Sequence, residues 1–169
     1  MGTRGFIAIK GEGKTLGTYN HFDSYPSWLG LRMLEFVQRQ DFADLVAKLA
    51  TLQRVDEQEE PTAEQLADLK ERGFWQDVGT GRDWYSALRG AQGDLAAYLT
   101  AGYIPALDVE AALNEKETWL EWGYIVDLDA SSLDVYASEY GVGWRKAASY
   151  SFEFIRGQGD AARSAMERL

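Results

Sequence analysis

The chain has 169 residues, of which 46% are hydrophobic and 26% charged, so a disordered chain is disfavoured and one domain with a substantial core is expected. Seventeen basic and 27 acidic residues give a net charge of −10, which disfavours binding to duplex nucleic acid because the acidic field repels phosphates. The absence of cysteine excludes disulfides, a thiol nucleophile and a thiolate metal site.

The N-terminal segment predicts a β-hairpin. Residues 3–9 and 15–20 read as two strands, and Gly11 and Gly13 permit the positive φ angles of a tight connection. Residues 6–9 are all apolar, which predicts a central strand that is covered on both faces.

Helices follow the hairpin. Pro26 suits a first helical turn, with Asp23 or Ser24 as its cap, and the polar residues up to residue 39 occupy one narrow arc of a mostly buried helix. A second helix is predicted over residues 42–52, and a third begins near residue 62 with capping-box spacing.

The C-terminal third returns to strands. Residues 120–129 alternate between apolar and polar, a short turn follows, and residues 133–136 complete a second hairpin. Residues 149–155 predict a last strand. Strands at both ends and helices between them indicate a single α+β domain over residues 1–169, with both hairpins in one antiparallel sheet.

The segment TYNHFDSYPSWLG, residues 18–30, contains the only histidine of the chain, His21. Asn20 and His21 leave a strand end, where loops commonly carry function, and Asp23 could orient the imidazole. If Arg4 projects at the same edge, the corner suits an anionic or amide-bearing small ligand. In the alternative interpretation these side chains only cap the helix and hydrogen-bond the turn.

Aromatic residues are the compositional outlier, with six tryptophans, nine tyrosines and seven phenylalanines. Such a surplus is typical either of a binding surface or of an aromatic-rich core. Taken with a predicted loop at residues 141–146, it completes our set of candidate ligand-binding residues: Arg4, Asn20, His21, Asp23, Tyr25, Trp28, Trp144 and Arg145.

Other motifs predict no chemistry. The GKT at residues 13–15 lacks the P-loop glycine, because position 8 is alanine. The acidic run at residues 127–134 lacks the spacing of a calcium loop and predicts aspartates on an exposed strand face. Residues 79–84 could form an anion-holding nest. We expect no catalytic residue, metal or cofactor.

Two resemblances follow from these segments. The opening TRG, the block at residues 19–30 and the block WGYIVDLDASSLDVY at residues 122–136 resemble a family of uncharacterised proteins from actinobacteria and their phages. That resemblance implies an accessory role in a bacterial host cell. The opening strand, hairpin and NHFD segment also resemble the start of N-terminal-nucleophile amide hydrolases, although Gly2 offers no nucleophile and Thr3 would serve only after Gly2 is removed.

The sequence also predicts localisation. It has no stretch near the roughly 20 apolar residues of a membrane span, and its N-terminus lacks the apolar core of a signal peptide. We therefore expect a cytoplasmic protein without membrane association.

Three functional hypotheses stay open. The first is a non-catalytic small-ligand-binding protein, such as a phage anti-defence protein that sequesters a nucleotide-like signal. The second is an acidic protein-interaction module that inhibits a host enzyme, and the third is an amide hydrolase of the N-terminal-nucleophile type.

Overall fold

The structure is a computed structural model that describes residues 2–74 and 82–169. Its strands are β1 (Gly5–Gly11), β2 (Lys14–Asn20), β3 (Gln53–Val55), β4 (Tyr103–Pro105), β5 (Trp122–Asp127), β6 (Ser132–Glu139) and β7 (Gly143–Ser151). Its α-helices are α1 (Leu31–Arg39), α2 (Phe42–Thr51), α3 (Ala63–Glu71), α4 (Trp84–Ala87), α5 (Leu95–Ala101), α6 (Val109–Asn114), α7 (Phe152–Gly157) and α8 (Gly159–Glu167). A π-helical turn, η1 (Pro26–Gly30), precedes α1, and a 3-10 turn, η2 (Arg89–Ala91), follows α4.

The predicted α+β class is confirmed. Five strands form one sheet in the order β2-β1-β5-β6-β7, and β3 pairs with β4 in a small parallel sheet. Both predicted hairpins belong to the larger sheet, but they meet in a parallel pair, β1 with β5. The sheet is therefore mostly rather than wholly antiparallel.

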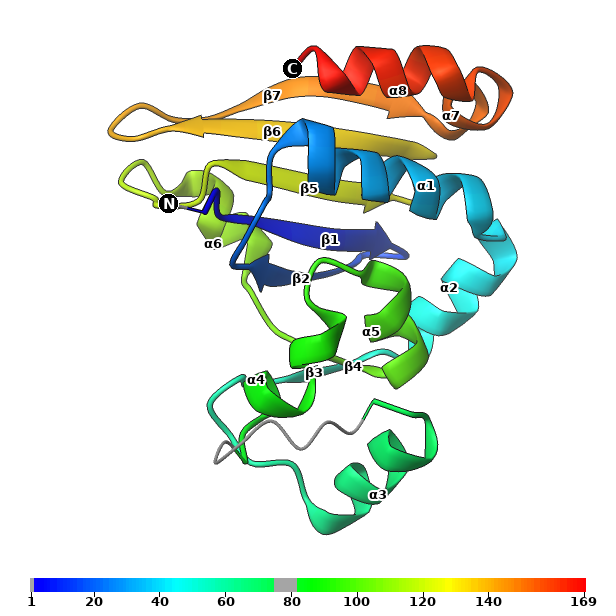
Figure 1. The fold of residues 1–169 in the computed structure, drawn as a ribbon, viewed down its shortest axis with the longest axis vertical. Helices are drawn as coiled ribbons and strands as arrows, with labels where there is room; N and C mark the ends of the chain where they lie inside the picture. Colours follow the sequence, from blue (N-terminus) through cyan, green and yellow to red (C-terminus); the bar gives the residue numbers. More distant parts are fainter. Residues whose placement is uncertain (1, 75–81) are drawn as a thin grey trace.

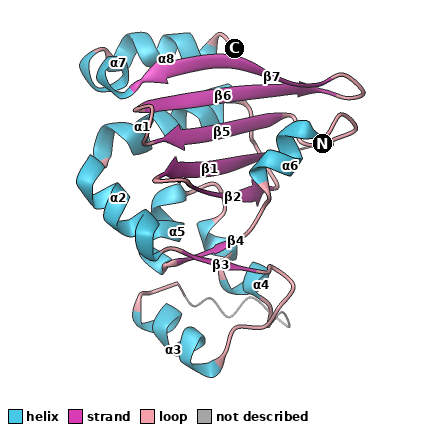
Figure 2. Ribbon diagram, turned by 180° about the vertical axis from the view of Figure 1, so that it is seen from behind, coloured by secondary structure: helices cyan, strands magenta, loops and turns pink. Residues whose placement is uncertain are grey.

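Different helices pack on the two faces of this sheet (Figure 1). The helices α1, α5, α7 and α8 pack with the main hydrophobic core on one face, which we call the helical face. The short α6 lies on the opposite side, seen from behind in Figure 2, and we call that side the α6 face. Strand β1 lies between β2 and β5 and its residues 6–9 are fully buried, as its apolar run predicts.

Local signals explain most element ends. Thr62 and Gln65 form the predicted capping box at the start of α3. The β1–β2 turn takes positive φ at Glu12 and Gly13, whereas Gly11 stays within the strand, so the predicted role of Gly11 in the turn is wrong.

The predicted last strand is wrong beyond Ser151. The Ser151 hydroxyl accepts a hydrogen bond from the Phe154 backbone N–H at 3.1 Å, and this cap begins helix α7. The strand instead extends toward the N-terminus, to Gly143.

Candidate functional site

The bend between β2 and η1 is braced from within. The Asn20 side-chain amide donates hydrogen bonds to the Phe22 carbonyl oxygen at 2.5 Å and to the Ser24 hydroxyl at 2.8 Å. The Ser24 backbone N–H donates to the Thr3 carbonyl oxygen, and the Tyr124 hydroxyl donates to the Ser24 carbonyl oxygen. Because Asn20 and Ser24 are buried, these bonds fix the bend from the core side.

The histidine lies on the other side of the bend. Tyr19 pairs with Phe6 and shares its α6 face, and its hydroxyl lies 2.7 Å from His21 Nδ1. The His21 ring packs edge-to-face on Phe22 with centroids 4.2 Å apart. Burial raises the pKa of Tyr19, and the nearby Arg4 cation partly opposes that rise. Arg4, Tyr19 and His21 therefore form one group, with Asn20 on the opposite face.

Neither Asp23 nor Ser24 caps the following helix. The N-cap position of η1 is Tyr25, and no side chain bonds to the helix there. Asp23 takes a positive φ of 51°, so its backbone makes the turn that redirects the chain. The predicted cap is wrong because the helix begins with a π-type turn at Pro26, one residue later than a cap at Ser24 would require.

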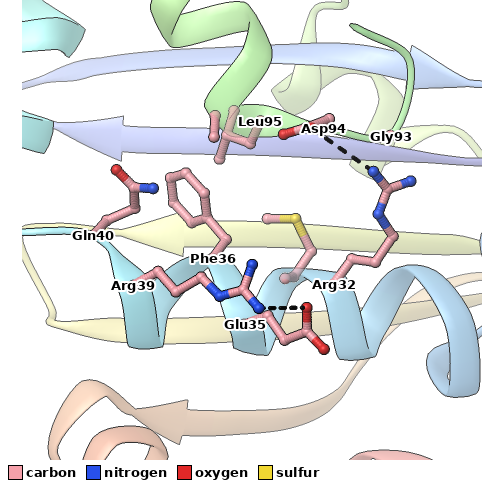
Figure 3. A pocket seen from close by; sticks show the side chains of 10 residues that line it. Arg32, Glu35, Phe36, Arg39, Gln40, Gly93, Asp94 and Leu95 are labelled. Atoms are coloured by element: carbon pink, nitrogen blue, oxygen red, sulfur yellow. Dashed lines mark ion pairs between the residues drawn. The ribbon is translucent and has the colours of Figure 1, made fainter.

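Three of the candidate residues line one concavity. Asn20, Asp23 and Trp28 surround a space of about 140 Å³, together with Phe22, Leu29, Arg32, Gln92 and Gly93. A second concavity of about 230 Å³ shares Arg32 and Gly93 and continues between α1 and α5 (Figure 3). We call these two adjoining concavities the Arg32 hollow.

Arg32 is the cation of this hollow. Its guanidinium Nη2 lies 3.8 Å from Asp94 Oδ2, and both side chains are nearly half exposed. Arg39, two helical turns further along the same face of α1, lies 3.8 Å from Glu35. Such exposed pairs are weak, so both guanidinium groups stay available to an incoming anion. Sequence analysis placed these side chains only on a polar arc and missed their role.

Gly93 keeps the hollow open. A side chain there would place its Cβ 3.1 Å from Asn20 Oδ1 and 3.4 Å from Arg32 Nη1. The positive φ of 70° at this residue also favours glycine. Since the Asn20 amide nitrogen is committed to the bend, its side-chain oxygen is the group that Asn20 presents toward Gly93 and Arg32.

Exposed aromatic rings stand beside the hollow. Trp28 and Phe22 both line it, and they are 54% and 55% exposed. Rings this exposed bury little area in the protein itself, so they are available to stack on a planar ligand.

The remaining candidates lie elsewhere. Arg4, His21 and Tyr25 do not line the Arg32 hollow. Trp144 and Arg145 do not line it either, and they begin strand β7 instead of occupying a loop, which corrects that prediction. The Trp144 ring packs on Phe6 with centroids 5.5 Å apart, and its indole Nε1 is buried without a hydrogen-bond partner among the described residues.

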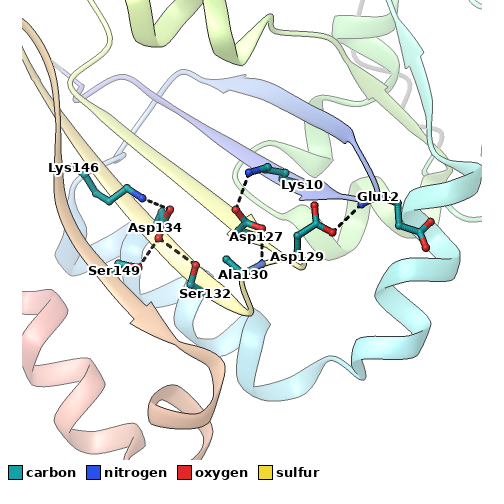
Figure 4. A network of polar contacts seen from close by, with 9 residues as sticks. All are labelled: Lys10, Glu12, Asp127, Asp129, Ala130, Ser132, Asp134, Lys146 and Ser149. Atoms are coloured by element: carbon teal, nitrogen blue, oxygen red, sulfur yellow. Dashed lines mark hydrogen bonds and ion pairs between the residues drawn. The ribbon is translucent and has the colours of Figure 1, made fainter.

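Two of the three aspartates of the second hairpin are buried instead of exposed as predicted, whereas Asp129 is exposed. Asp127 and Asp134 are 7% exposed, and Lys10 and Lys146 pair with them at 3.0 and 2.6 Å (Figure 4). The alternation is as expected, but the long lysine stems cover the carboxylates.

A concavity of about 700 Å³ adjoins this charged row and is lined partly by Lys10, Asp108, Glu110 and Tyr136. Arg54 also lines it, whereas Lys10 is already paired with Asp127. Carboxylates line both concavities, but the Arg32 hollow combines two arginines with the exposed indole of Trp28, so it is the better candidate for a planar anionic ligand.

Residues 2–74 and 82–169 contain no group of three or more metal-ligating side chains. Within the same ranges no helix has the length and apolar character to cross a membrane. The predicted nest at residues 79–84 lies partly outside the described residues, because these omit 79–81.

Comparison of the chain with protein-family models, curated proteins and solved structures found no match. The two resemblances inferred from the sequence blocks therefore stay predictions.

Proposed function

We propose that this protein binds a small anionic ligand with a planar ring system, such as a nucleotide, in the Arg32 hollow and without chemical conversion. The observation that carries the proposal is the convergence of Asn20, Asp23 and Trp28 with Arg32 on one concavity. These residues combine a cation, a carboxylate, an amide oxygen and an exposed indole within one small space. Nucleotides carry the complementary groups.

Each group has a defined role in this proposal. The Arg32 guanidinium would donate paired hydrogen bonds to the phosphate oxygens, a geometry that lysine cannot reproduce. Trp28 would stack on the base, and the Asn20 side-chain oxygen would accept a hydrogen bond from an exocyclic amino group. Arg39, in the adjoining concavity, would contact a second phosphate.

Sequestration is the biological role that suits such a site. In the setting implied by the phage resemblance, the protein would remove a nucleotide-like defence signal of the host. Binding without turnover would be sufficient for that purpose.

Thermal-shift measurements with a panel of linear and cyclic nucleotides test this proposal. A ligand at 100 times its Kd stabilises the native state by about 2.7 kcal/mol, which is easily measured. We expect at least one nucleotide to raise Tm for the wild type and for His21→Ala, but not for Trp28→Ala. The proposal fails if no nucleotide raises Tm, or if Trp28→Ala responds like the wild type.

A further inference from the structure

Three large apolar side chains are exposed together at one end of the sheet. Trp119 is 71% exposed, Tyr140 is 60% exposed and Val142 is 66% exposed. The Trp119 and Tyr140 rings lie with centroids 5.4 Å apart. We call this group the aromatic tip. It is separate from the Arg32 hollow, whose lining contains none of the three residues.

Hydrogen bonds hold the aromatic tip in place. The Gly141 backbone N–H donates to the Lys116 carbonyl oxygen at 2.7 Å, which ties the β6–β7 turn to the loop that carries Trp119. At the base of the turn, the Ser138 N–H donates to the Glu121 carbonyl oxygen at 3.0 Å. The turn and this loop project side by side from the same end of the sheet in Figures 1 and 2. The rings are therefore pre-organised, which lowers the entropy lost when a partner binds.

Acidic side chains surround the aromatic tip. Glu115, Glu117, Glu121 and Glu139 are all exposed, and Lys116 is the one cation among residues 115–121. Within the described part of the chain, none of these four carboxylates forms an ion pair within 4.0 Å. Their charge is therefore available to a binding partner.

We infer that the aromatic tip docks into a partner protein through an apolar pocket rimmed by lysine and arginine. Tryptophan and tyrosine are among the residues that most often dominate the binding energy of protein interfaces. The four exposed glutamates supply negative charge that complements a basic partner. The same glutamates repel nucleic acid and anionic membranes. They also oppose a second copy of this chain, since two tips would bring like charges together.

Selection from a displayed random-peptide library tests this inference, because the library samples apolar and basic sequences alike without favouring either. The wild-type protein serves as bait, with Trp119→Ala as the counter-selection. We expect the enriched peptides to combine apolar residues with lysine or arginine. Their Kd should weaken at least tenfold for Trp119→Ala and Tyr140→Ala, and should weaken as salt rises.

Trp28→Ala is the matched control, because it removes an exposed tryptophan from the Arg32 hollow. It should bind the peptides like the wild type, so failure of the aromatic tip is distinguishable from failure of the ligand site. Should an alanine variant unfold, Glu117→Lys and Glu139→Lys supply the same test, with weakened binding expected.

Four outcomes would overturn the inference. In the selection, these are a failure to enrich any peptide and the enrichment of peptides without basic residues. The third is binding of the peptides by Trp119→Ala with the wild-type Kd. The fourth is a tip that instead drives self-association or binding to phosphatidylcholine vesicles.

Discussion

On the helical face of the sheet, Ile9 of β1 is fully buried among side chains of the main core. One residue further along the same strand, Lys10 points to the α6 face, where it is nearly half exposed and bonded to Asp127. The helical face thus depends on apolar burial. The far end of the α6 face depends on charge pairing, which changes with pH.

The side chains of the bend after β2 are also divided between the two faces of the sheet. Asn20 belongs to the helical face and borders the Arg32 hollow, whereas Tyr19 and His21 belong to the α6 face and bond to each other. Groups that are adjacent in sequence therefore face different surroundings. The proposed ligand site therefore lies on the helical face, where the helices leave a hollow.

The largest expected effect is a loss of unfolding free energy at Ile9, compared with that at its neighbour Lys10 on the opposite face. Ile9→Ala should lower the free energy of unfolding by about 2–5 kcal/mol, because it leaves a cavity in the main core. Lys10→Ala should cost less, about 1–2 kcal/mol, because Lys10 is nearly half exposed and the buried Asp127 carboxylate keeps its hydrogen bond from the Ala130 N–H. Urea denaturation followed by circular dichroism measures both values. Equal losses of unfolding free energy would contradict the claim that the two faces are stabilised differently.

A smaller effect is expected at the bend. Asn20→Ala removes the donor that the Phe22 carbonyl and the buried Ser24 hydroxyl share, so the free energy of unfolding should fall by about 1–3 kcal/mol. His21→Ala removes one half-buried contact and should cost about 1 kcal/mol or less. Denaturant titration of both variants is the measurement, and a greater loss for His21→Ala would contradict the assignment of Asn20 as the brace.

The charged row predicts a pH dependence. Burial alone would raise the pKa of Asp127, but hydrogen bonds from the Ala130 N–H and from Lys10 outweigh it and hold the pKa below the ordinary 3.8. A depressed carboxyl pKa stabilises the native state above pH 3.8, and that stabilisation is lost as pH falls toward the lower native-state pKa.

Asp127→Asn removes this titration. The difference in unfolding free energy between wild type and Asp127→Asn should therefore shrink when denaturation is repeated at falling pH from 7 toward 3. A difference that stays constant over that range would show that the carboxylate does not stabilise the fold through its charge.

The smallest expected effect concerns Trp144. Trp144→Phe removes an indole N–H that is buried without a partner, which offsets the packing area lost, so the free energy of unfolding should change by less than about 1 kcal/mol. Thermal denaturation checks this value. A loss above about 2 kcal/mol would mean that the indole nitrogen has a partner in solution.

Sequence reasoning predicted the fold well where periodicity was strong. Residues 6–9 predicted a central strand and Thr62 predicted a helix start, because each signal is local. It failed at Ser151, where a serine cap ended the strand, and it did not foresee the parallel pairing of β1 with β5. That pairing joins residues more than 100 positions apart, which no local pattern reports.

The site was predictable only in part. Asn20, Asp23 and Trp28 lie close in sequence, so one block indicated all three. Arg32 was visible only as part of a polar helix arc, and Gly93 lies about 60 residues further along the chain. Tertiary packing brings them together, and so their role could not be read from spacing. His21 does not line the hollow and instead contacts Tyr19, which points to the α6 face.

Isothermal titration calorimetry with the nucleotide that gives the largest thermal shift tests the central claim most directly. Arg72→Ala is the matched control, because Arg72 is as exposed as Arg32 and pairs with Asp68, outside the Arg32 hollow. We predict that Arg32→Ala weakens binding at least tenfold, as loss of charge-assisted hydrogen bonds of about 1.5–3 kcal/mol requires. Arg72→Ala should keep the wild-type Kd within twofold. Equal Kd values for the two variants would contradict the account.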